Sequence, residues 1–175
     1  MTTTQSRIRS HIANLGNANN EVAQRAERLL IRHYGARALG LLIDACKSPN
    51  PSVRFRAVWV LGYTRAPGAF EAIMELTNDL AGTVRYDAVM ALGVLGDARA
   101  IPPLLALAAQ DADEIQIPSA AFSALMRLNE LALPALQTAS QSDPDDRIRR
   151  AATEILAHIA EVAEIYHTIP YPRAL

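Results

Sequence analysis

The chain has 175 residues, of which 50% are hydrophobic, 20% charged and 5% aromatic, and its formal net charge is −1. This composition indicates one folded domain with a sizeable core and excludes a disordered chain. A net charge so near zero gives no overall attraction to nucleic acid or anionic lipid. The single cysteine, Cys46, excludes an intramolecular disulfide and a metal site made of cysteines alone. The N-terminus does not resemble a signal peptide and no apolar run is long enough to span a bilayer, so we expect a cytoplasmic protein without a membrane partner.

One pattern recurs five times: a Val or Ile, an Ala four positions later and a Leu eight positions later. With the first residue as offset 0, the copies start at Val22, Val53, Val84, Ile117 and Ile148, which by subtraction are 31, 31, 33 and 31 residues apart. Offsets 0, +4, +7 and +8 lie on one face of an α-helix. An Ala at offset +4 in every copy indicates a helix contact too close for a larger side chain.

The pattern predicts two helices in each repeat, A and then B, after a leading cap helix at 5–15. The A helices are expected at 21–33, 51–63, 82–95, 115–129 and 145–165, and the B helices at 36–47, 67–79, 98–110 and 131–141. Gly96 and Asp97 are predicted as the C-cap glycine of one helix and the N-cap of the next. Asn50–Pro51 and Asp143–Pro144 are predicted to open A helices, and Pro67 suits the first turn of a B helix. Nothing alternates with period two, so no strand is expected.

The clearest copy, from Val84 to Ala100, reads V-R-x-x-A-x-x-A-L-G-x-L-G-D-x-R-A. It resembles the short HEAT-like repeat of phycobilin lyase-type proteins and many other prokaryotic scaffolds, and the resemblance covers residues 17 to about 162. The fourth repeat departs from it, with Pro118 in place of the arginine and Met126 in place of the glycine. The resemblance implies an all-α, right-handed α–α superhelix of about five helical hairpins with a leading cap helix.

These expectations give one domain over 1–165 and a C-terminal tail over 166–175. Within the domain, the repeats are expected near 17–48, 49–79, 80–112, 113–142 and 143–165.

The outer columns of the A helices, at offsets +2, +6 and +10, are the best candidate site. They lie opposite the buried stripe and are polar in repeats one, four and five. In repeats two and three they form what we call the aromatic ridge: Phe55, Trp59, Tyr63, Tyr86, Met90 and Val94. An exposed apolar patch of this kind is typical of a partner-binding surface. Two alternatives stay open: the N-terminal segment or C-terminal tail covers the ridge, or the helix phase differs from the one assumed.

A weaker candidate surface comes from the resemblance, which implies a concave face lined by the B helices. Its predicted exposed residues are Arg37, Asp44, Glu71, Glu75, Asp79 and Gln110. Mixed charges at helical spacing usually mark a solvated surface, so this face is the second choice.

Other notable residues favour structural roles. Arg54, Arg85 and Arg149 at offset +1 are expected to pair with acids or loop carbonyls of adjacent repeats. Gly62 and Gly93 are expected to allow close helix approach, and Cys46 to be a small buried residue. The four histidines are dispersed, and the acids at 143, 145 and 146 suit a helix N-terminus, so no metal or other cofactor is expected.

The sequence therefore predicts a non-catalytic scaffold that binds another protein or a second copy of itself. No nucleophile, base and orienting acid can be assembled from it. The alternative implied by the resemblance is an accessory subunit or chaperone of a phycobilin lyase-type enzyme. Nucleic-acid binding of the HEAT-like DNA glycosylase kind is disfavoured by the net charge and by the lack of a basic stripe.

Overall fold

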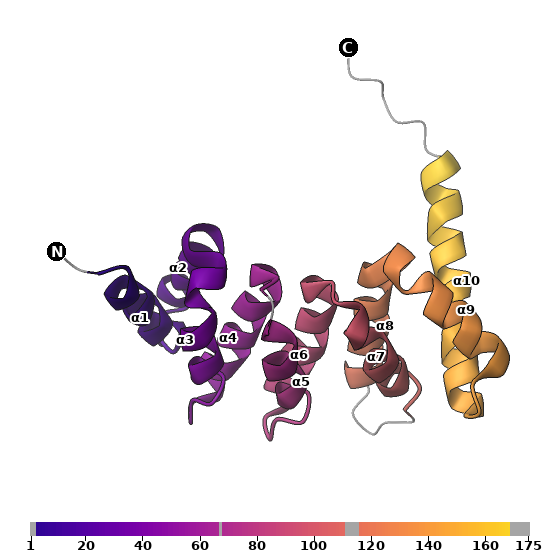
Figure 1. The fold of residues 1–175 in the computed structure, drawn as a ribbon, viewed down its shortest axis with the longest axis horizontal. Helices are drawn as coiled ribbons and strands as arrows, with labels where there is room; N and C mark the ends of the chain where they lie inside the picture. Colours follow the sequence, from indigo (N-terminus) through magenta and orange to yellow (C-terminus); the bar gives the residue numbers. More distant parts are fainter. Residues whose placement is uncertain (1–2, 67, 111–115, 169–175) are drawn as a thin grey trace, which may run out of the picture.

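The computed structural model describes residues 3–66, 68–110 and 116–168, with side chains up to Glu164. Within those ranges the chain is helical and has no strand, and consecutive helices stack from α1 at one end to α10 at the other (Figure 1). The A helices are α2 (Asn20–Leu29), α4 (Pro51–Thr64), α6 (Gly82–Leu95), α8 (Gln116–Leu128) and α10 (Asp146–Thr168). The B helices are α3 (Leu39–Ala45), α5 (Ala69–Leu76), α7 (Ile101–Ala108) and α9 (Leu133–Ser142), and α1 (Thr4–Leu15) precedes them. The predicted all-α repeat architecture is confirmed.

The first repeat differs most from the prediction. A π-helical turn, Leu30–Tyr34, follows α2, and a 3₁₀ turn, Gly35–Ala38, precedes α3. Gly35 has φ +47°, a left-handed value that favours glycine and stops the helix there. The B helix of this repeat therefore begins at Leu39 rather than at residue 36.

The predicted apolar stripe forms the core. The five alanines at offset +4 are at most 2% exposed: Ala26, Ala57, Ala88, Ala121 and Ala152. The leucines at offset +8 are fully buried in the first four repeats, but Leu156 in α10 is only partly buried. Val22 in α2 is 36% exposed. The stripe residues are therefore less completely buried in the first and last repeats, each of which has another repeat on one side only.

Two glycines let successive A helices approach closely, as predicted. A Cβ added to Gly93 in α6 would lie 2.7 Å from the Cα of Ala124 in α8. A Cβ added to Gly62 in α4 would lie 2.9 Å from the backbone oxygen of Ala91 in α6. Since these obstacles are backbone atoms, no side-chain rotation relieves them.

The arginines at offset +1 brace the loops between repeats, which confirms the structural interpretation. In each case one guanidinium nitrogen donates to two successive loop carbonyls: Arg54 to Ser48 and Pro49, Arg85 to Asp79 and Leu80, and Arg149 to Asp143 and Pro144. Arg54 also donates to both carboxylate oxygens of Asp79, at 2.7 and 2.8 Å, and so ties the loop before α4 to the loop before α6. The bidentate pair lowers the pKa of Asp79.

Most predicted caps are present. The Asn50 side chain accepts from the Ser52 N–H, Asp97 accepts from the Arg99 N–H, and Gly96 is left-handed at φ +74°. The cap predicted at Asp143–Pro144 is wrong. The last A helix begins at residue 146, because the carboxylate of Asp145 accepts a hydrogen bond from the N–H of Arg147. Asp145 occupies the same position in its repeat as Asn50 does in the second repeat. Pro67 lies outside the described residues.

We expect Gly93→Ala to destabilise the fold although alanine favours helix. The added methyl meets the backbone of α8, which costs about 1–3 kcal/mol in the free energy of unfolding. Gly40→Ala is the matched control, because nothing lies within 4 Å of a Cβ at this helical glycine. It should stabilise the protein by about 0.5–1 kcal/mol. Urea denaturation measures both, and equal effects of the two substitutions would contradict the close-contact explanation.

Candidate functional site

The aromatic ridge runs over two neighbouring A helices, α4 and α6. Tyr63 and Tyr86 are 40% and 38% exposed, and Phe55, Trp59 and Met90 are partly buried. The indole of Trp59 packs edge-on against the ring of Tyr63, with centroids 5.3 Å apart and planes at 70°. This is a favourable geometry for two aromatic rings, so the pair forms a preorganised patch.

One ridge residue does not lie where it was predicted. Val94 is 4% exposed and therefore belongs to the core. It directly follows Gly93, where α8 lies closest to α6, and its short side chain does not reach beyond that contact. Tyr63, at the same offset in α4, is long enough to reach the solvent. The ridge consequently consists of the exposed Tyr63 and Tyr86 together with the partly buried Phe55, Trp59 and Met90.

Charged groups border the ridge at its α2 side. The guanidinium of Arg56 donates to the carboxylate of Glu27 and to the side-chain oxygen of Asn20 in α2, and it lies 4.9 Å from the centroid of the Phe55 ring. These contacts pin α4 to α2 and hold Phe55 in its half-buried position. Arg56 is therefore engaged within the fold rather than offered to a ligand.

Asp87 is a partly buried carboxylate next to Tyr86, and sequence reasoning missed it. Its pKa is raised to about 6, chiefly by burial and also by the charge of Glu27, while Arg56 acts to lower it. No hydrogen bond to its carboxylate is present among the described residues. A half-buried acid without a hydrogen-bonding partner favours the neutral form. The sequence gives no signal for the raised pKa, because Asp87 is a single acid between the apolar neighbours Tyr86 and Ala88.

The B-helix face holds the second set of candidates, and the structure divides them. Arg37, Asp44, Glu71, Glu75 and Gln110 are exposed, as predicted. Arg37 donates to the carbonyl of His33, and Glu71 accepts from Arg99 at 2.6 Å.

Asp79 is the second correction. Its side chain is 7% exposed, and both carboxylate oxygens are bound by Arg54. Its place in the loop between repeats puts it within reach of that arginine, so it serves the fold and not an open surface.

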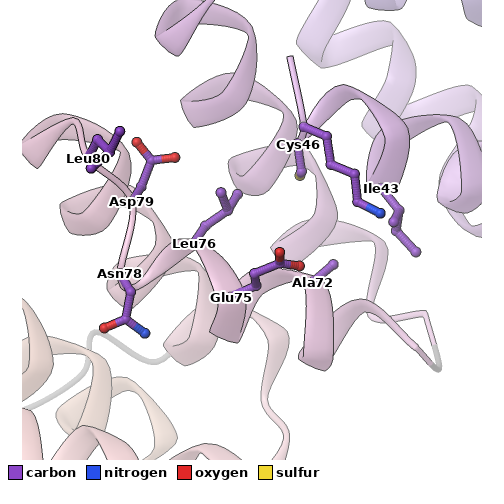
Figure 2. A pocket seen from close by; sticks show the side chains of 9 residues that line it. Ile43, Cys46, Ala72, Glu75, Leu76, Asn78, Asp79 and Leu80 are labelled. Carbon is purple, nitrogen blue, oxygen red and sulfur yellow. The ribbon is translucent and has the colours of Figure 1, made fainter. Parts of the chain in front are cut away.

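A cleft of about 420 Å³ opens between α3 and α5 on the B-helix face (Figure 2). Cys46 and Ile43 line one side, and Ala72, Glu75 and Leu76 line the other. Cys46 is 5% exposed, and burial raises the pKa of its thiol to about 12. The thiol is therefore protonated at neutral pH and is not an activated nucleophile. The prediction that Cys46 is a small buried residue is confirmed.

A larger cleft, of about 640 Å³, lies between α7 and α9, and sequence reasoning missed it as well. Ile101, Pro102, Leu105 and Pro134 supply much of its apolar lining, and Asp143 is its one ionisable residue. The available signal was the complete lack of charged residues in α7 and α9.

Across the described ranges, no three His, Cys, Asp or Glu side chains converge as metal ligands, and no helix has the length and apolar content to cross a bilayer. The acids at the start of α10 are bound to arginines: Asp145 to Arg147, and Asp146 to Arg149 and Arg150. The pKa of Asp145 is lowered to about 2, chiefly by the hydrogen bond from Arg147. Of the C-terminal tail predicted at 166–175 as one cover for the ridge, the part up to Thr168 belongs to α10, and residues 169–175 lie outside the described residues.

We expect Asp87→Asn to stabilise the protein in a pH-dependent way. Because the pKa of Asp87 is raised in the folded state, ionisation lowers the free energy of unfolding above about pH 6, and this penalty disappears as the pH falls to about 4. After discounting for partial exposure, the gain should be about 1 kcal/mol at pH 8 and small at pH 4. Urea denaturation at both pH values, with the exposed Asp44→Asn as control, measures it. Destabilisation at pH 8, or an equal gain at both pH values, would contradict this account.

Comparison with known proteins relates this geometry to a family. The chain matches the family model "HEAT repeats" over residues 8–93 and 72–157. A search of curated protein sequences finds no match. The fold is similar to a chain in the complex of CpcE and CpcF of phycocyanin lyase from Nostoc sp. PCC7120, with a TM-score of 0.55 and 22% identity over 92% of this chain.

The alignment spans 66% of that longer chain, and identity at this level shows a shared fold. An engineered protein has a TM-score of 0.49 and 17% identity over 88% of this chain and 79% of its own. A designed armadillo repeat protein in complex with the peptide (KR)4 has a TM-score of 0.46 and 20% identity over 85% and 80%. The resemblance drawn from Val84–Ala100 is confirmed: this chain belongs to the HEAT repeat family.

Proposed function

We propose that this HEAT repeat protein is a non-catalytic scaffold that binds another protein through the aromatic ridge. The observation that carries the proposal is the exposure of Tyr63 in α4 and Tyr86 in the adjacent helix α6. Trp59, in an outer column of α4, packs against Tyr63. Tyrosine and tryptophan are enriched among the residues that dominate binding energy at protein interfaces. Their presence outside the core therefore supports a binding role.

The ridge is bounded by polar side chains, as an interface core requires. At the same offsets, repeats one, four and five present exposed polar side chains, among them Gln24, Arg28, Ser123 and Glu154. The ridge also rests on two tightly packed helices, so that its side chains lose little freedom on binding. A polar rim around a rigid aromatic centre favours a protein partner.

The clefts on the B-helix face support binding rather than chemistry. In the cleft between α3 and α5, the thiol of Cys46 is buried and protonated, and the carboxylate of Asp79 is bound by Arg54. The weaker candidate surface for a partner remains the exposed residues of this face: Arg37, Asp44, Glu71, Glu75 and Gln110. Solenoids of this kind commonly use their long faces for recognition.

An accessory role beside a phycobilin lyase-type enzyme is the second candidate. The observation that favours it is the fold shared with a chain of the phycocyanin lyase complex of CpcE and CpcF. Arg28 and Arg32, exposed at the ridge offsets of α2, could pair with the propionates of a bilin. Mixing the protein with a bilin and an apo-phycobiliprotein tests this role, and an unchanged absorbance spectrum would argue against it.

The double variant Trp59→Ala/Tyr86→Ala tests the ridge. We expect the immobilised variant to lose at least one protein that the wild type captures from native lysate, because truncating an aromatic anchor typically weakens binding by about 30-fold or more. Leu80→Ala/Leu131→Ala is the matched control, since these leucines are 99% and 46% exposed and lie off the ridge. Capture of the same proteins by all three forms, with unchanged circular dichroism, would remove the ridge as the binding surface.

A further inference from the structure

Arginines without partners gather at the N-terminal end of the stack. Arg7 and Arg9 in α1, Arg25 and Arg28 in α2, and Arg32 in the following turn are all exposed. None of the five has an ion pair or a side-chain hydrogen bond within the described part of the chain. The sequence predicted no basic stripe, and the near-zero net charge hides these arginines because it averages over the whole chain.

Arginines further along the chain are mostly engaged with acids. Arg54 binds Asp79, Arg99 binds both Asp97 and Glu71, and Arg147 binds Asp145. The N-terminal surface is different because acids are scarce there: Glu27 is bound to Arg56, which leaves Glu21. This end of the rod therefore carries uncompensated positive charge.

The opposite end of the rod carries negative charge. Residues 151–164 of α10 include Glu154, Glu161 and Glu164 and neither lysine nor arginine; all three glutamates are exposed, and Glu161 lies 3.7 Å from Nδ1 of His158. Figure 1 shows α1 and α10 at opposite ends of the stack. The two charged surfaces therefore cannot meet within one copy.

The outward side of α10 is also shaped to receive another element. Thr153 and Ala157, at offsets +5 and +9, are exposed. At offset +9 the inner helices α4 and α6 carry Gly62 and Gly93, which face the next A helix at close range. A small residue in the last helix leaves the same side open to close approach.

We propose that the N-terminal arginine surface of one copy binds the C-terminal half of α10 in a second copy, head to tail. Two different surfaces make this contact, so each copy keeps one free end, and the assembly grows instead of closing as a symmetric dimer. The contact leaves the aromatic ridge uncovered and repeats it along the assembly. The proposal does not depend on what the ridge binds.

Sedimentation velocity of the wild type over a wide concentration range tests the assembly first. We expect the average mass to rise continuously with protein concentration at about 50 mM salt. At about 500 mM salt, where the exposed charges are screened, association should weaken by about tenfold or more. A monomer at every concentration in low salt overturns the proposal.

Charge reversal at each end identifies the surfaces. Arg7→Glu/Arg9→Glu/Arg25→Glu and Glu154→Arg/Glu161→Arg/Glu164→Arg should each be monomeric alone, because both ends of either variant then carry the same sign. An equimolar mixture should associate again, since each reversed end meets an opposite charge on the other variant. Arg65→Glu/Arg127→Glu, exposed positions away from both ends, should assemble like the wild type.

Several results would assign the surfaces differently. Assembly that persists in both end variants, or that Trp59→Ala/Tyr86→Ala abolishes, places self-association elsewhere and overturns the proposal. A mixture that stays monomeric while circular dichroism shows both variants folded also overturns it. If the wild type binds a single-stranded oligonucleotide, loses it on reversal of the arginines and does not self-associate, the surface serves nucleic acid instead.

Discussion

The close approach of successive A helices is the constraint on which the rest of this structure depends. Gly62 meets the backbone of Ala91, and Gly93 meets that of Ala124, with no room for a methyl group between them. Such contacts turn separate helical hairpins into one row, because each hairpin buries its apolar stripe only against its neighbours. They also decide details of the surface, since Val94 is covered where α8 lies nearest and Tyr63 is not.

The buried stripe and the braced loops leave the outer columns of the A helices free to vary. Arginines at offset +1 hold the loop carbonyls, and Arg54 links two loops through Asp79. The residues that hold the stack together are therefore internal to it. In the outer columns, the second and third repeats carry aromatic side chains, and the first repeat carries arginines. The architecture and the proposed recognition surface are therefore carried by different columns of the same helices.

Periodicity predicted the helices well, because the same helical pattern occurs in five repeats and each copy supports the assignment of the others. The alanines at offset +4, the glycines, and the cap at Asn50 followed from spacing and turn chemistry. The predictions that failed depend on which residues lie close together in space, and spacing along the sequence does not give that. Val94 is short beside a close helix contact, Asp79 lies within reach of Arg54, and the cap of α10 is at Asp145. The cleft between α7 and α9 and the positive charge of the N-terminal end arise from several elements together, and a single column of residues does not reveal them.

The central claim is that the ridge is an open surface in the free protein. Trp59 is the sole tryptophan, so its fluorescence reports on the ridge directly. Acrylamide quenching of the full-length chain is the most direct measurement. A partly buried indole on an uncovered ridge predicts ready quenching in the free protein and protection when a partner is added. Emission that is blue-shifted and shielded from acrylamide in the free, monomeric chain would show the ridge already covered, and would contradict the account.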